Sequence, residues 1–120
     1  MYENRGDDLR KRTKVFALRI VRLFGALPNT AVAQVIGKQL LRSGTSLGAY
    51  YREATRARST KEFISKIEGG TQELEETMYW LELLIEGEII PETKLTDLLQ
   101  EAEELMSILV ASVKTAKQRT

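Results

Sequence analysis

The sequence predicts an all-α fold, an antiparallel up-and-down four-helix bundle in which residues 1–120 form a single domain. Three observations support this prediction: apolar residues recur at helical spacing in four long segments, no segment alternates like a β-strand, and only two prolines interrupt the chain. With 42% apolar residues, the chain can bury an ordinary core. We expect helices at about residues 7–27, 31–57, 60–86 and 92–117, joined by short connections.

An apolar stripe, a stop signal and a cap predict the first two helices. The stripe ends just before Pro28, which cannot continue a helix. Thr30 can cap the second helix, because its hydroxyl accepts a hydrogen bond from an amide of the first turn. The stripe of the first helix consists of Leu9, Phe16, Ile20, Leu23 and Leu27.

The third and fourth helices have their own boundary signals. Ser59 and Glu62 have the spacing of a capping box, Gly87 ends the third helix, and Pro91 suits the first turn of the fourth. The stripe of the third helix is Phe63, Ile67, Gly70, Leu74, Met78, Leu81 and Ile85, and that of the fourth is Leu95, Leu98, Ala102, Leu105, Leu109 and Val113.

The composition argues against an enzyme. The chain has no His and no Cys, which excludes disulfides, Cys nucleophiles, His-based triads and the commonest zinc sites. We therefore expect no catalytic residue, no metal and no cofactor. No apolar run approaches the roughly 18 residues of a membrane span, and residues 1–12 are polar, unlike a signal peptide. These observations predict a cytoplasmic protein without a membrane partner.

Charge is distributed unevenly along the chain although it nearly cancels. The first 58 residues hold 12 Lys and Arg against four Asp and Glu, whereas residues 59–120 hold six against 13. Two interpretations remain open: oppositely charged helix faces meet within the bundle or between subunits, or the basic half forms a surface for phosphates.

The first helix is apolar around most of its circumference. Val15, Leu18, Val21 and Phe24 lie off its core stripe, with Leu18 nearly opposite. A helix that is apolar on two sides usually buries both, so these four residues are candidates for an interface between subunits. The alternative is scattered surface hydrophobics, which are common.

The middle of the second helix combines small residues with aromatic and basic ones. Gly44 and Gly48, one turn apart, would let a neighbouring helix approach closely, and we favour tight packing or a kink over a phosphate loop. The tyrosines and arginines that follow suit either nucleic-acid binding or a protein interface, since both kinds of surface use aromatic and basic side chains. The candidates are Gly44, Gly48, Tyr50 and Tyr51 for the oligomer interface, and Arg52, Arg56 and Arg58 for phosphate contacts.

Two carboxylates lie one turn apart on the third helix, Glu73 and Glu76. Carboxylate-bridged di-iron bundles need Glu-x-x-His motifs, which a chain without His lacks, and an all-carboxylate magnesium site or a hydrolase has little support. We instead predict structural ion pairs between these two residues and a basic residue of the second helix, Arg42, Arg52 or Arg56.

Several short motifs between residues 39 and 85 carry a resemblance to a known family. They are QLLRSGTSLGA at 39–49, REA at 52–54, ARS at 57–59, EFI-x-K at 62–66 and E-x-x-ET-x-YWLELL at 73–84. This pattern resembles the small bacterial four-helix-bundle family named for proteins encoded in intervening sequences of 23S ribosomal RNA genes. Two features depart from the family pattern: Tyr50 stands where Asn is usual, and Gly69-Gly70 replaces an aliphatic–Ala pair.

The resemblance implies a ring-like homopentamer, which agrees with a first helix that is apolar on two sides. A related branch comprises the accessory proteins of diversity-generating retroelements, basic pentamers that bind nucleic acid and a reverse transcriptase. The function expected on this basis is a non-enzymatic scaffold that associates with RNA or DNA. The alternative is a purely protein-interaction scaffold, for example an accessory subunit of a reverse transcriptase or another enzyme. Carried over to this chain, the candidate phosphate contacts on the first helix are Arg10, Lys11, Arg12, Arg19 and Arg22.

Overall fold

The computed structural model describes the backbone of residues 2–119 and the side chains of residues 8–119. As the sequence predicted, the described chain is all-α and contains no strand. Its elements are α1 (Tyr2–Ala26), α2 (Ala31–Thr55), α3 (Thr60–Glu86), the short 3₁₀ helix η1 (Glu92–Lys94) and α4 (Thr96–Gln118). Within this part of the chain, no helix combines the length and the apolar character that crossing a bilayer requires.

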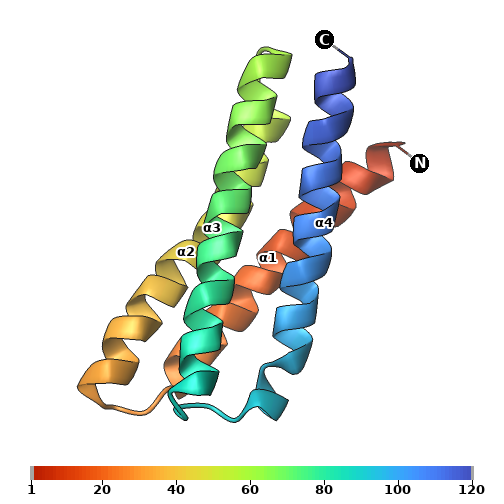
Figure 1. The fold of residues 1–120 in the computed structure, drawn as a ribbon. Helices are drawn as coiled ribbons and strands as arrows, with labels where there is room; N and C mark the ends of the chain where they lie inside the picture. The colour runs from red at the N-terminus through yellow and green to blue at the C-terminus, as the bar shows by residue number, and fades with distance from the viewer. Residues whose placement is uncertain (1, 120) are drawn as a thin grey trace.

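Successive helices run in opposite directions and pack side by side (Figure 1). The bundle is elongated, with extents of 48 × 24 × 19 Å. α2 packs along both α1 and α3, and α4 packs along α3. α1 is tilted relative to the other helices, so it meets α4 only over a short stretch (Figure 1). α1 and α3 consequently occupy diagonal corners of the bundle.

The predicted caps form at the starts of α2 and α3. The Thr30 hydroxyl accepts a hydrogen bond from the Ala33 amide at 3.2 Å, and the Ser59 hydroxyl accepts one from the Glu62 amide at 3.0 Å. The Glu62 carboxylate accepts from the Arg58 amide at 3.4 Å, so the second bond of the capping box involves the residue before the cap. These bonds satisfy amides that have no partner within their own helix.

Helix boundaries differ from the prediction at three places. α1 is already helical from Tyr2, and α2 ends at Thr55. α4 begins at Thr96, so the prediction that Pro91 lies in its first turn is wrong. Pro91 is extended (φ −62°, ψ 140°) and is followed by the single 3₁₀ turn of η1. Leu95, at φ −113°, interrupts the helical geometry before α4 starts.

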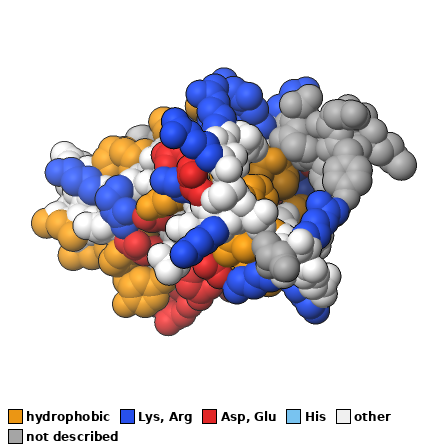
Figure 2. Space-filling model, turned by 90° about the horizontal axis from the view of Figure 1, so that it is seen from above, with side chains coloured by type: hydrophobic (Ala, Val, Ile, Leu, Met, Phe, Trp, Pro, Cys, Tyr) orange, Lys and Arg blue, Asp and Glu red, His pale blue; other side chains and the backbone are white. Residues whose placement is uncertain are grey.

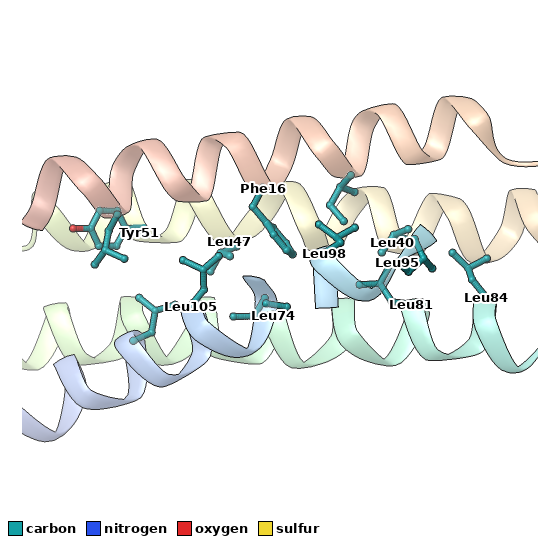
Figure 3. Packing of buried hydrophobic residues seen from close by; sticks show 14 of the residues in the cluster. Phe16, Leu40, Leu47, Tyr51, Leu74, Leu81, Leu84, Leu95, Leu98 and Leu105 are labelled. Atoms are coloured by element: carbon teal, nitrogen blue, oxygen red, sulfur yellow. The ribbon is translucent and has the colours of Figure 1, made fainter. Parts of the chain in front are cut away.

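The core follows the predicted stripes, with one exception on α3 (Figure 3). All six stripe residues of α4 are buried, and so is the stripe of α1 apart from Leu23, which is partly buried. On α3 the stripe lies slightly to one side of the prediction. Thr77 and Leu84 are fully buried, whereas the predicted residues Phe63, Met78 and Ile85 are only partly buried.

A stripe of glycines on α2 sets the distance between α2 and α1. A Cβ atom at Gly44 would lie 2.8 Å from Ile20 Cγ1, and one at Gly37 would lie 2.6 Å from Leu27 Cδ1. Gly48 faces Thr13 at 3.5 Å. The close approach predicted for Gly44 and Gly48 is therefore present at Gly44, where the neighbouring helix is α1 of the same chain, whereas at Gly48 a Cβ atom would be at an ordinary contact distance.

Replacing Gly44 with Ala should destabilise the fold by about 1–3 kcal/mol, because the added methyl group would displace Cγ1 and Cγ2 of the fully buried Ile20. The measurement is urea unfolding followed by circular dichroism.

Gly25→Ala is the matched control. A Cβ atom at Gly25 meets nothing within 4 Å, so this change should leave stability unchanged or raise it by up to about 1 kcal/mol through helix propensity. Equal effects of the two substitutions would contradict the close-packing explanation.

Candidate functional site

The two ends of the bundle carry opposite charge. One end contains the α2–α3 connection, the end of α4 and the start of the described part of α1. The stretches toward this end, residues 8–14, 44–73 and 107–119, hold 12 Lys and Arg against five Asp and Glu. The stretches toward the other end, residues 15–43 and 74–106, hold five against ten. Seen along the bundle, Lys and Arg side chains lie at several places around the basic end (Figure 2).

Sequence reasoning missed about half of the basic end. Arg52, Arg56 and Arg58 were candidates, but the structure adds Lys14 from α1, Lys61 from α3, and three residues near the end of α4. The second half of the chain is acidic as a whole, which hid these cations. A count along each antiparallel helix, rather than along the chain, could have found them. The three residues of α4 are Lys114, Lys117 and Arg119.

A shallow groove between α1 and α2 adjoins the basic end. Its volume is about 350 Å³, and it is lined by Thr13, Lys14, Ala17, Thr45, Gly48, Ala49 and Arg52. The small residues leave the groove open, and within the described residues no carboxylate forms an ion pair with Lys14 or Arg52. Two unneutralised cations beside an open groove suit an anionic group such as a phosphate.

Most predicted phosphate contacts are accessible. Of the eight predicted phosphate contacts, Arg12 alone forms an ion pair with a carboxylate within residues 8–119. Arg19 is half-buried, and Arg19 and Arg22 lie in the part of α1 farther from the basic end. The exposed members are Arg10, Lys11, Arg22, Arg52, Arg56 and Arg58.

Arg12 is not a free phosphate contact. Its guanidinium makes two bonds to the Glu101 carboxylate, at 2.8 and 3.0 Å, and a third to Glu104 at 3.2 Å. The hydrogen bonds to Glu101 raise the pKa of Arg12 above its ordinary value. Arg12 therefore holds α1 to α4 at the place where the tilted helix crosses, which corrects its assignment as a phosphate ligand.

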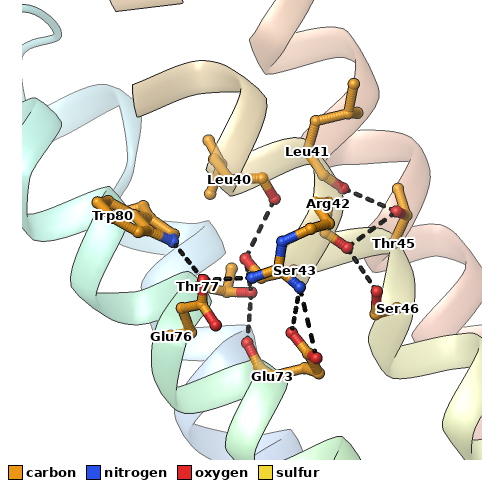
Figure 4. Close-up of polar contacts among 10 residues, drawn as sticks. All are labelled: Leu40, Leu41, Arg42, Ser43, Thr45, Ser46, Glu73, Glu76, Thr77 and Trp80. Atoms are coloured by element: carbon orange, nitrogen blue, oxygen red, sulfur yellow. Dashed lines mark hydrogen bonds and ion pairs between the residues drawn. The ribbon is translucent and has the colours of Figure 1, made fainter. Parts of the chain in front are cut away.

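A polar network joins α2 to α3 (Figure 4). Arg42 pairs with both Glu73, at 3.1 Å, and Glu76, as the sequence predicted. The Trp80 indole also donates to Glu76, at 3.1 Å. The hydrogen bond from Arg42, with a second from Trp80, lowers the pKa of the Glu76 carboxyl. Within the described residues, no cluster of three His, Cys, Asp or Glu could hold a metal ion.

The candidate interface residues fall into two groups. Val15, Leu18 and Val21 of α1 are exposed, at 54%, 43% and 46% of their surface. The others pack inside the chain instead: Phe24 lies against Gly37, Gly44 and Gly48 face α1, and Tyr51 is only 6% exposed. Gly44 and Tyr51 are buried in the bundle, which corrects their assignment to an oligomer interface, whereas the assignments of the partly buried Phe24 and Gly48 stay predictions.

The two departures from the family pattern touch each other. A Cβ atom at Gly69 would lie 2.6 Å from Cε1 of the half-buried Tyr50. The tyrosine ring therefore occupies the space that a side chain at residue 69 would take. This pairing places Tyr50 against α3 of the same chain, and because the residue is only half-buried, its assignment to the oligomer interface stays a prediction.

Comparisons with known proteins agree on one family. The family model described as "23S rRNA-intervening sequence protein" matches residues 7–111. A crystal structure from Bacteroides thetaiotaomicron, described as a protein with unknown function from the S23 ribosomal protein family, has 38% identity and a TM-score of 0.85. That match covers 91% of this chain and 97% of the other. No protein with a curated description matches significantly.

Replacing Glu76 with Gln should lower the free energy of unfolding at pH 7 by about 0.5–1 kcal/mol, because it removes one partner of Arg42. The pKa of Glu76 is lower in the folded state than in the unfolded chain. Its contribution is therefore complete above the unfolded-state pKa near 4.5 and is lost as the pH falls through the folded-state pKa. The free energies of unfolding of wild type and variant, measured by urea unfolding at fixed protein concentration, should therefore converge as the pH falls through the folded-state pKa. The control is Glu103→Gln, which removes an exposed carboxylate of α4 and should change the free energy of unfolding at pH 7 by less than Glu76→Gln does.

Proposed function

Because the chain belongs to the 23S rRNA-intervening sequence protein family, we propose that it is a non-enzymatic homo-oligomeric scaffold that associates with RNA or DNA. The proposed assembly is a ring-like homopentamer. The exposed apolar residues of α1, Val15, Leu18 and Val21, support an assembly, since a helix apolar on two sides usually buries both. The proposed ligand is the phosphate backbone, because no feature of this surface selects particular bases.

The observation that carries the proposal is the concentration of Lys and Arg at one end of the bundle. A near-neutral chain would be a weak binder if its charges were mixed over the surface. Here each subunit presents a local basic surface, and bundles placed side by side in a ring would present their basic ends on one rim. Several modest sites on one particle gain avidity that a single site lacks.

A protein-interaction scaffold is the second candidate, with a reverse transcriptase or another enzyme as its partner. The acidic end of the bundle favours this alternative, because it offers a surface of opposite sign to a basic protein. If this scaffold binds no nucleic acid at all, its basic residues contribute only to contacts between subunits. The two candidates then differ in what a charge change at the basic end alters, which is nucleic-acid affinity in one case and assembly in the other.

Arg56→Glu should weaken binding to a fluorescein-labelled single-stranded RNA by about tenfold and reduce the salt dependence, because it removes a phosphate contact. Fluorescence anisotropy between about 50 and 200 mM salt measures both. Lys94→Glu makes the same charge change at the acidic end and should have a much smaller effect.

Two results would contradict the nucleic-acid proposal. One is wild-type binding that is absent or insensitive to salt. The other is an Arg56→Glu variant with unchanged affinity and reduced assembly stability, which would favour the protein scaffold.

A further inference from the structure

Two exposed stripes lie on helices at diagonal corners of the bundle. On α1, Lys11, Val15, Leu18 and Arg22 follow one another at helical spacing, and all four are exposed. Lys14 and Val21 flank them and are exposed as well. We call this surface the α1 outer face. It is apolar in the middle and basic toward both ends.

The corresponding stripe on α3 is acidic. Its residues again follow helical spacing, and each is exposed: Glu68, Gln72, Glu75, Tyr79, Glu82 and Glu86. We call this surface the α3 outer face. Tyr79 is its large apolar residue, with 54% of its surface exposed. Glu68 also pairs with Lys117 at 3.5 Å, whereas the described residues provide no basic partner within ion-pair distance of Glu75, Glu82 or Glu86.

We propose that the α1 outer face of one copy binds the α3 outer face of the next copy. This inference rests on the homo-oligomeric state in the proposed function. Two α1 outer faces would bring basic residues together, and two α3 outer faces would bring carboxylates together. Only the mixed pairing places opposite charges around the apolar contact of Leu18 with Tyr79.

The mixed pairing is of the kind that builds rings. A contact between two different faces leaves one free face on each side of every pair, so further copies add until the ring closes. A contact between identical faces stops at a dimer. The diagonal positions of α1 and α3 keep the two faces apart on each subunit, so one copy can bind a neighbour on each side.

Contacts inside the bundle place the two faces at overlapping heights. Ile20 lies against Gly44, and the neighbouring Ser43 is hydrogen-bonded to Thr77 at 2.9 Å. Leu18 lies two residues before Ile20, and Tyr79 lies two residues after Thr77. Because α1 and α3 run in the same direction, the two residues are about 6 Å apart along the bundle axis, both near its middle. In a closed ring, each copy must bind the next without a shift along the ring axis. This condition requires that the two faces overlap in height along the bundle. The pairing covers Lys11 and Lys14 of the basic end, whereas Arg52, Arg56 and Arg58 lie outside both faces.

The test uses one charge substitution on each face. Leu18→Glu places a carboxylate against the acidic face, and Tyr79→Lys places an ammonium against the basic face. Each variant alone should be monomeric by native mass spectrometry where the wild type is assembled, since we expect association to weaken by about 100-fold or more. Val35→Glu changes an exposed valine of α2 outside both faces and should remain assembled. Unchanged helix content by circular dichroism shows that the variants fold.

Mixing the two variants gives the decisive measurement. The Leu18→Glu chain keeps an intact α3 outer face, and the Tyr79→Lys chain keeps an intact α1 outer face. The mixture should therefore form one-to-one heterodimers. Because the two substituted faces carry opposite charges, any larger species should hold the two chains in equal numbers. A Tyr79→Lys variant that keeps the wild-type mass, or a mixture that stays monomeric, would overturn the pairing.

The pairing and the nucleic-acid proposal can fail separately. A wild type that binds RNA and assembles, but whose mass neither substitution changes, overturns the pairing alone. An assembled wild type that shows the heterodimer and binds no RNA overturns the nucleic-acid proposal alone. A monomeric wild type overturns the pairing together with the proposed assembly.

Discussion

Close contact between α1 and the glycine stripe of α2 fixes the position of α1 in the bundle and thereby which of its residues are exposed. Without side chains at Gly37 and Gly44, α2 lets Leu27 and Ile20 of α1 approach its backbone. α1 is thereby fixed against α2 and tilted away from α4, where the Arg12 ion pairs are its polar connection. Because α1 buries only the side that faces α2 and the core, the residues around Leu18 remain exposed.

The second consequence concerns charge. In an antiparallel bundle, the end of one helix lies beside the start of the next, so charges that are distant in the sequence gather at one end. The basic residues at the end of α4 thus join Arg56 and Arg58 at the α2–α3 connection. The carboxylates of η1 and the start of α4 gather at the opposite end. A chain of formal net charge +1 consequently has a basic end and an acidic end.

The proposed assembly and the proposed ligand use surfaces that overlap only in part. The α1 and α3 outer faces lie on the sides of the bundle and include Lys11, Lys14 and Arg22, whereas most basic residues cluster at its end. The apolar and acidic residues on the sides suit contacts between subunits, because apolar burial and opposite charge both favour association. The exposed arginines at the end suit phosphates, which need accessible cations. One small bundle can therefore assemble through its sides and bind through its end.

Local patterns in the sequence specify the four helices, their caps at Thr30 and Ser59, and most of the core. These features depend on local hydrogen bonds and on periodicity, which neighbouring residues specify. The pairing of Arg42 with Glu73 and Glu76 was predictable too, because both partners lie on adjacent helices. Three other features arise from packing between distant segments. Arg12 is bound to α4, Tyr50 lies on Gly69, and the end of α4 completes the basic surface. Each of these depends on the tilt or order of helices, which contacts between distant residues set.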